Sequence, residues 1–159
     1  MKNTILTYDD IKKIKGGNSN EKLVNVNTYD DSIEAQYEKF DMVAYAGFEI
    51  LVRETVARKL AVVNKRLHAK YNLTLKVVYG YRSLEVQTNY FNRKQMELNS
   101  VNPKLPPGEL VALTHNFVAV PEVAGHVTGG AIDLTLVKSN GKACDMGCLL
   151  YTSPSPRDS

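Results

Sequence analysis

The chain has few cysteines, no long apolar run and little net charge. Its two cysteines, Cys144 and Cys148, lie four residues apart, which makes neither a disulfide framework nor a strong zinc motif. No run of eighteen apolar residues is present, so we expect no transmembrane helix and no membrane partner. The net charge is +3 and no basic face carries interleaved aromatics, so we predict no nucleic-acid partner.

The beginning of the chain lacks the pattern of a secretory signal. Residues 1–10 contain neither an apolar core nor a small-residue cleavage site. A cytoplasmic location is therefore the expectation. The length of 159 residues, with 43% hydrophobic and 23% charged residues, is typical of one globular domain.

The clearest helix and strand patterns lie in the middle of the chain. Residues 51–71 predict a helix, because apolar residues recur every three or four positions. Leu73–Tyr79 alternates and predicts a strand. Ser83 is a suitable N-cap for a second helix from Leu84 to about Asn99, which leaves Arg82 in a strand-to-helix loop. The apolar stripe of the first helix comprises Val52, Val56, Leu60, Val63 and Leu67.

Weaker patterns flank this region. Leu23–Tyr29 alternates and predicts a short edge strand. The apolar stretch Glu109–Val120 predicts a strand that ends at Pro121. Asn140-Gly141 is a hairpin-turn signal, after which Ala143–Gly147 would begin a returning strand. Residues 33–50 give no firm assignment.

The most informative stretch carries a histidine and a carboxylate. His126 and Asp133 lie seven residues apart, and the glycine pair Gly129-Gly130 between them permits a turn that brings the two together. Ile132, Leu134 and Leu136 alternate with other residues, so Asp133 falls in a half-buried strand among apolar neighbours. A carboxylate there needs a partner, and a metal ion is one candidate. The alternative is a hydrogen-bonded pair that only orients a loop.

Three other polar residues have plainer interpretations. His68 lies near the end of the first helix, where a capping or surface role is the simpler one. His115 could supply a metal ligand, but a histidine with satisfied hydrogen bonds is the simpler interpretation. By the same reasoning, Arg82 taken alone would be a surface arginine that bonds a nearby carbonyl.

Three motifs follow one another along the chain. Gly80-Tyr81-Arg82 follows a predicted strand, His126–Leu136 spans the histidine and the aspartate, and Asp145-Met146-Gly147 follows the hairpin turn. In this order they resemble the D-alanyl-D-alanine dipeptidases, zinc peptidases related to the peptidoglycan D,D-carboxypeptidases. The second motif is similar to that family's His-x-x-Gly-x-Ala-x-Asp-Leu-Thr-Leu zinc motif. The likeness covers roughly residues 23–147.

The resemblance implies an α+β fold, with a small, mostly antiparallel sheet and helices packed on one side. It implies one Zn²⁺ ion, with His126 and Asp133 as ligands. Arg82 would be the cation that stabilises the oxyanion, and Asp145 would shape the site. The implied activity is hydrolysis of the small peptide D-Ala-D-Ala, in peptidoglycan metabolism or glycopeptide resistance.

Two departures from the family pattern affect these expectations. Ala124 stands where the family usually has serine, which weakens the outer support of the metal. The family's third ligand and general base lie in a later Glu-x-x-His, and nothing after Gly147 matches it. Residues 148–159 resemble a translated sequencing adapter. We therefore expect a lead-in at 1–22, an incomplete domain at 23–147, a non-native tail and an inactive chain.

Two alternatives stay open. A D,D-carboxypeptidase that trims peptidoglycan stem peptides shares the histidine–aspartate motif, although Thr135-Leu136, Asp145-Met146-Gly147 and the missing secretion signal favour the dipeptidase. The other alternative is a metal-free scaffold protein that keeps the fold without the chemistry.

Overall fold

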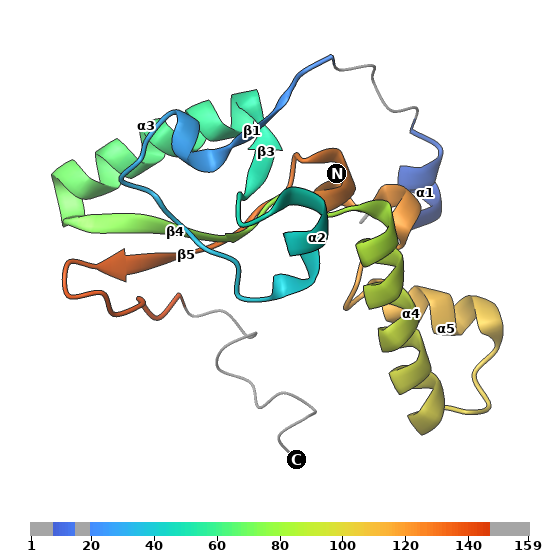
Figure 1. Cartoon of the computed structure of the whole chain (residues 1–159). Coiled ribbons are helices and arrows are strands. Elements are labelled where there is room, and N and C mark those ends of the chain that lie inside the picture. Colours follow the sequence, from blue (N-terminus) through green and yellow to red (C-terminus); the bar gives the residue numbers. More distant parts are fainter. Residues whose placement is uncertain (1–7, 15–19, 147–159) are drawn as a thin grey trace, which may run out of the picture.

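The computed structural model describes residues 8–14 and 20–146 and shows an α+β fold (Figure 1). Its three-stranded sheet has β4 (Leu73–Tyr79) in the centre, parallel to β2 (Glu34–Ala35) and antiparallel to β5 (Asp133–Lys138). A separate antiparallel pair joins β1 (Leu23–Asn25) to β3 (Leu51–Arg53). The predicted fold class is therefore confirmed, and most of the strand pairing is antiparallel.

Helix α3 (Glu54–Tyr71) packs along the sheet next to β4 (Figure 1). The helix was predicted, and its buried stripe was right in part, since Leu60 is buried and Val56 and Leu67 are partly buried against the core. Val52 belongs to β3, and the Val63 side chain is 44% exposed. The buried residues are Ala57, Leu60, Ala61 and Asn64. Short alanine side chains let the helix approach the sheet closely, so the buried face includes two alanines that the stripe of larger apolar residues left out.

Helices α4 (Leu84–Val101) and α5 (Pro107–His115) pack against each other (Figure 1). The predicted cap of α4 is confirmed, since Ser83 Oγ accepts a hydrogen bond of 3.2 Å from the Val86 amide. The strand predicted over Glu109–Val120 is wrong, because α5 occupies most of it. A proline at the first helical position is already set for the helix, and the apolar run alone does not separate a buried strand from a short buried helix.

The remaining elements are short. They are α1 (Tyr8–Lys12), α2 (Val43–Ala46) and the 3-10 turns η1 (Val26–Thr28), η2 (Phe40–Met42), η3 (Pro121–Val123) and η4 (Gly125–Thr128). The predicted edge strand ends early, at Asn25, whose side chain accepts a hydrogen bond from the Asn27 amide and so caps η1. No helix among residues 8–14 and 20–146 has the length and apolar character to cross a membrane.

The hairpin after β5 forms as predicted. Gly141 adopts φ 75°, and Val137 pairs with Ala143 across the turn. After the turn, the described residues 143–146 form one isolated β-bridge, at Ala143, and not the predicted returning strand. Gly147 and the predicted tail at 148–159 lie outside the described residues, as does most of the predicted lead-in.

A bulge in the central strand prepares the candidate site. Val77 faces Leu134 and Tyr79 faces Asp133, so Val78 is an extra residue in β4. Bulges of this kind redirect side chains and are common beside functional sites. Here the bulge places Tyr79, at the carboxyl end of β4, opposite the first residue of β5.

Candidate active site

The turn that carries His126 is held from the side of β3. The Arg53 amide donates to the carbonyl oxygen of Gly129 at 2.9 Å, and Arg53 Nε donates to that of Thr128 at 2.6 Å. Gly129 adopts φ 72°, in the left-handed region that favours glycine. The predicted turn therefore forms at the first glycine of the pair, and it returns the chain from His126 towards β5.

The structure brings His126 and Asp133 together. His126 Nδ1 lies 2.8 Å from the carbonyl oxygen of Gly80, and Nε2 lies 3.5 Å from Asp133 Oδ1. The carbonyl only accepts hydrogen bonds, so Nδ1 carries the proton and donates it. With Nδ1 as the donor, Nε2 of the neutral ring is an acceptor, and it faces a carboxylate oxygen, which is an acceptor as well. The contact between the two is favourable only when a proton or a cation is bound at Nε2.

This donor pair fits a zinc ion. At ligand distances of about 2.0–2.2 Å, two ligands of a tetrahedral zinc lie roughly 3.3–3.6 Å apart, which includes the observed Nε2–Oδ1 separation. Zinc-binding histidines usually donate the other ring N–H to a carbonyl or carboxylate, as His126 does to Gly80. Ala124 is buried and offers no polar side-chain atom, so the observed support of the His126 ring comes from the Gly80 carbonyl.

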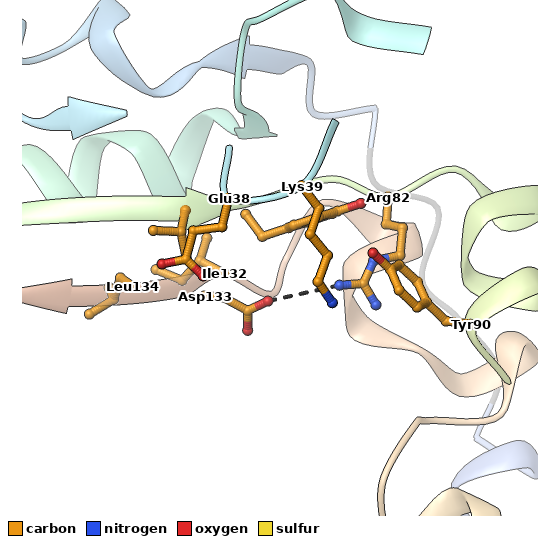
Figure 2. A pocket seen from close by; sticks show the side chains of 9 residues that line it. Glu38, Lys39, Arg82, Tyr90, Ile132, Asp133 and Leu134 are labelled. Atoms are coloured by element: carbon orange, nitrogen blue, oxygen red, sulfur yellow. Dashed lines mark ion pairs between the residues drawn. The ribbon is translucent and has the colours of Figure 1, made fainter. Parts of the chain in front are cut away.

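Asp133 is less buried than its strand pattern predicts. Its side chain is 53% exposed, because it is the first residue of β5. Arg82 Nη2 lies 3.8 Å from Asp133 Oδ2, the ion pair drawn in Figure 2. The contact with His126 lowers the pKa of Asp133 below its ordinary value, with help from the charges of Arg82 and Lys39 and against the effect of burial. The carboxylate is therefore ionised and ready to bind a cation at neutral pH.

Arg82 is not a surface arginine. Its side chain is 14% exposed, and Nη1 donates to Gln87 Oε1 at 2.8 Å. Its backbone amide donates to the carbonyl oxygen of His126 at 3.0 Å, which ties the strand-to-helix loop to η4. Two short hydrogen bonds thus connect the first two sequence motifs: the His126 ring donates to the Gly80 carbonyl, and the Arg82 amide donates to the His126 carbonyl.

Two cavities meet at these residues. One, of about 460 Å³, lies between β4, β5 and the segment before η2 (Figure 2). The other, of about 340 Å³, reaches α4 and the loop after α5. Both are lined by Lys39, Arg82, Tyr90 and Asp133. Lys39 and Tyr90 had no sequence signal, because they come from segments without a recognisable motif.

The other predicted residues lie elsewhere. His115 Nδ1 accepts a hydrogen bond of 3.1 Å from the Val120 amide, and neither cavity includes it. Asp145 is exposed and lines a third cavity, of about 390 Å³, with Thr135 and Cys144. Among residues 8–14 and 20–146, no group of three or more histidine, cysteine, aspartate or glutamate side chains is placed to bind a metal ion.

No protein-family model matches this chain, and no curated protein does. One similar solved structure is a mutant of the vancomycin resistance D,D-pentapeptidase VanY in complex with Zn(II), with 20% identity, a TM-score of 0.44, and coverage of 57% of this chain and 48% of that one. Another is VanYB in complex with D-alanine-D-alanine, with 17% identity, a TM-score of 0.49, and coverage of 79% and 55%. The chain thus spans about half the length of these structures.

Proposed function

We propose that His126, Asp133 and Arg82 form the metal-binding and oxyanion-binding part of a zinc D,D-peptidase site, with D-Ala-D-Ala as the substrate. The observation that carries this proposal is the ring of His126, fixed by the Gly80 carbonyl with Nε2 at 3.5 Å from Asp133 Oδ1. The three sequence motifs that resemble the dipeptidases support the choice of substrate.

The residues divide the chemistry between them. A zinc ion bound by His126 and Asp133 would lower the pKa of a bound water towards neutrality and polarise the scissile carbonyl. Arg82 Nη2 lies 3.8 Å from Asp133 Oδ2, and this position supports a role for Arg82 in stabilising the negative charge that would develop on the carbonyl oxygen. Donors aimed at such a charge contribute about 3–4 kcal/mol each in acyl-transfer enzymes.

The described part of the chain supplies two of the three protein ligands that catalytic zinc sites use. We therefore expect residues 1–159 by themselves to bind zinc and D-Ala-D-Ala without measurable turnover. Binding, rather than hydrolysis, is the appropriate first test.

Zinc affinity is measured by competition with a chromophoric chelator. We expect one zinc ion per chain, bound at least tenfold more weakly by His126→Ala and by Asp133→Asn, since each variant removes a ligand. His115→Ala and His68→Ala are matched controls that leave the affinity unchanged, because neither residue lines the site. If His126→Ala bound zinc as tightly as the parent chain, the result would reject the metal site and favour the metal-free scaffold.

Substrate class is measured on the zinc-loaded chain by calorimetry. We expect D-Ala-D-Ala to bind more tightly than L-Ala-L-Ala, and Arg82→Met to weaken that binding. Indifference to the configuration of the dipeptide would contradict a D,D-peptidase.

A second candidate, a D,D-carboxypeptidase that trims stem peptides, is favoured by one observation. The two cavities share Lys39, Arg82 and Asp133, so a peptide longer than two residues has space on both sides of the site. Tighter binding of a stem pentapeptide that ends in D-Ala-D-Ala than of the free dipeptide would favour this candidate.

A further inference from the structure

The guanidinium group of Arg82 lies against two tyrosine rings. Its Cζ atom is 4.3 Å from the centre of the Tyr79 ring and 4.7 Å from that of Tyr90. Figure 2 shows Tyr90 beside the guanidinium group of Arg82. Aromatic faces attract cations at these distances, so the rings hold the charged group as well as bury it.

Both tyrosines donate to a single carboxylate, that of Asp41. Tyr79 donates to Oδ1 at 2.7 Å, and Tyr90 donates to Oδ2. The three residues come from β4, α4 and η2, and Asp41 is the point at which these elements are joined. We call them the Asp41–tyrosine cluster.

Burial and the hydrogen bonds to Asp41 keep both hydroxyls protonated. They raise the pKa of Tyr90 to about 12, and they raise that of Tyr79 further. Both hydroxyl groups therefore remain donors to Asp41 over the whole pH range in which the protein is expected to work.

Gln87 limits the remaining freedom of Arg82. Its side chain is 1% exposed, accepts from Arg82 Nη1 at 2.8 Å, and donates to the carbonyl oxygen of Ala119 at 2.8 Å. Nη1 is thereby occupied, and Nη2 is the end that faces Asp133. With the rings fixed on its faces, the guanidinium group is left with one orientation.

We propose that Asp41 is a positioning residue for Arg82: by holding Tyr79 and Tyr90 together, it fixes the guanidinium group with Nη2 towards the His126–Asp133 pair. That this orientation serves an oxyanion rests on the proposed function. The orientation itself does not, and it is tested without metal or substrate.

The experiment follows the Arg82 Nε–H group by NMR in the metal-free chain. Nε is buried and has no hydrogen-bond partner among the described residues, so we expect stacking on the rings to be what protects its N–H group from solvent exchange. The measured quantity is the exchange rate of Arg82 Nε–H divided by that of the Leu75 amide, which is buried in β4 and bonded to Asn64. The ratio separates a local loss of order at Arg82 from a general loss of stability.

We expect Asp41→Asn to raise this ratio about tenfold, the factor that loss of one hydrogen bond to a charged group implies. Asp31→Asn, the same substitution at an exposed aspartate, is expected to leave the ratio unchanged. If Asp41→Asn does not fold, Tyr90→Phe carries the test, since it keeps the ring and removes only the hydroxyl. An unchanged ratio in the folded variants overturns the proposal. If the parent chain binds no zinc but Asp41→Asn raises the ratio, the result rejects the proposed function and leaves the positioning role of Asp41 standing.

Discussion

The carbonyl oxygen of Gly80 lies 2.8 Å from Nδ1 of His126 and so sets the direction of a ring that comes 46 residues later in the chain. The backbone at Gly80 is itself tightly constrained. A Cβ atom there would lie 2.4 Å from the carbonyl oxygen of Leu51 and 2.9 Å from side-chain atoms of Ile50 and Val52. The geometry of the candidate metal site therefore depends on a close approach between Gly80, the residue after β4, and residues 50–52.

Gly80→Ala tests this dependence. The added methyl group forces the backbone just after β4 away from Leu51, so we expect a loss of about 1–3 kcal/mol in the free energy of unfolding, as in other overpacked sites. The displaced carbonyl should also weaken zinc binding roughly 10–100-fold, the usual effect of losing an outer hydrogen bond. Urea unfolding and chelator competition measure the two effects. Gly108→Ala, in the open first turn of α5, is the control and should be neutral or stabilising.

Gly129 and Gly141 form a matched pair for the turn that carries His126. Both have positive φ, 72° and 75°, so alanine strains the backbone at either position. Only at Gly129 would the new Cβ also meet a neighbour, Leu23 Cδ2 at 2.4 Å. We expect Gly129→Ala to lower both stability and zinc affinity, and Gly141→Ala to lower stability alone. Equal zinc affinities in the two variants would show that the turn does not position His126.

Local sequence signals predicted the parts of the fold that local interactions determine. The strand Leu73–Tyr79, the Ser83 cap and the hairpin at Gly141 each depend on neighbours within a few residues. The approach of His126 to Asp133 followed from the glycine pair between them. On α3 the stripe of large apolar residues identified Leu60 correctly but left out Ala57 and Ala61, whose small side chains also lie on the buried face.

The contacts around Arg82 could not be predicted from local pattern. Asp41 lies 38 residues from Tyr79 and 49 from Tyr90, in a region that gave no firm assignment. In the sequence, Gln87 is one polar residue of a predicted helix. Only the fold shows that its side chain donates to the carbonyl oxygen of Ala119. Such contacts depend on tertiary packing, which a single sequence does not encode in any short motif.

Asn64 joins helix α3 to both the sheet and the loop before β2. Its side chain is 2% exposed, accepts from the Leu75 amide at 2.8 Å, and donates to Asp30 Oδ2 at 3.1 Å and Ser32 Oγ at 2.9 Å. Asn64→Ala leaves the buried Leu75 N–H without an acceptor, so we expect a loss of about 2–3 kcal/mol in the free energy of unfolding. Urea denaturation measures it. Asn99→Ala, at an exposed position of α4, should change stability little.

The same contacts predict how stability responds to acid. Burial acts to raise the pKa of Asp30, but hydrogen bonds from Ser32 and Asn64, together with the charge of Lys65, outweigh it, so the pKa lies below its ordinary value. A carboxyl group whose pKa is lower in the folded state stabilises the protein fully above its unfolded pKa of about 3.9. That stability is lost as the pH falls through the folded-state pKa.

We therefore expect the free energy of unfolding of the parent chain to fall more steeply below about pH 4 than that of Asp30→Asn, which has no carboxyl group to titrate there. Well above that pH, the difference between the two proteins should be constant. Urea midpoints measured from neutral pH into acid give both slopes. Asp31→Asn, at the exposed neighbouring position, should keep the slope of the parent chain. If Asp30→Asn also kept that slope, the hydrogen bonds from Ser32 and Asn64 would not stabilise the ionised carboxylate in solution.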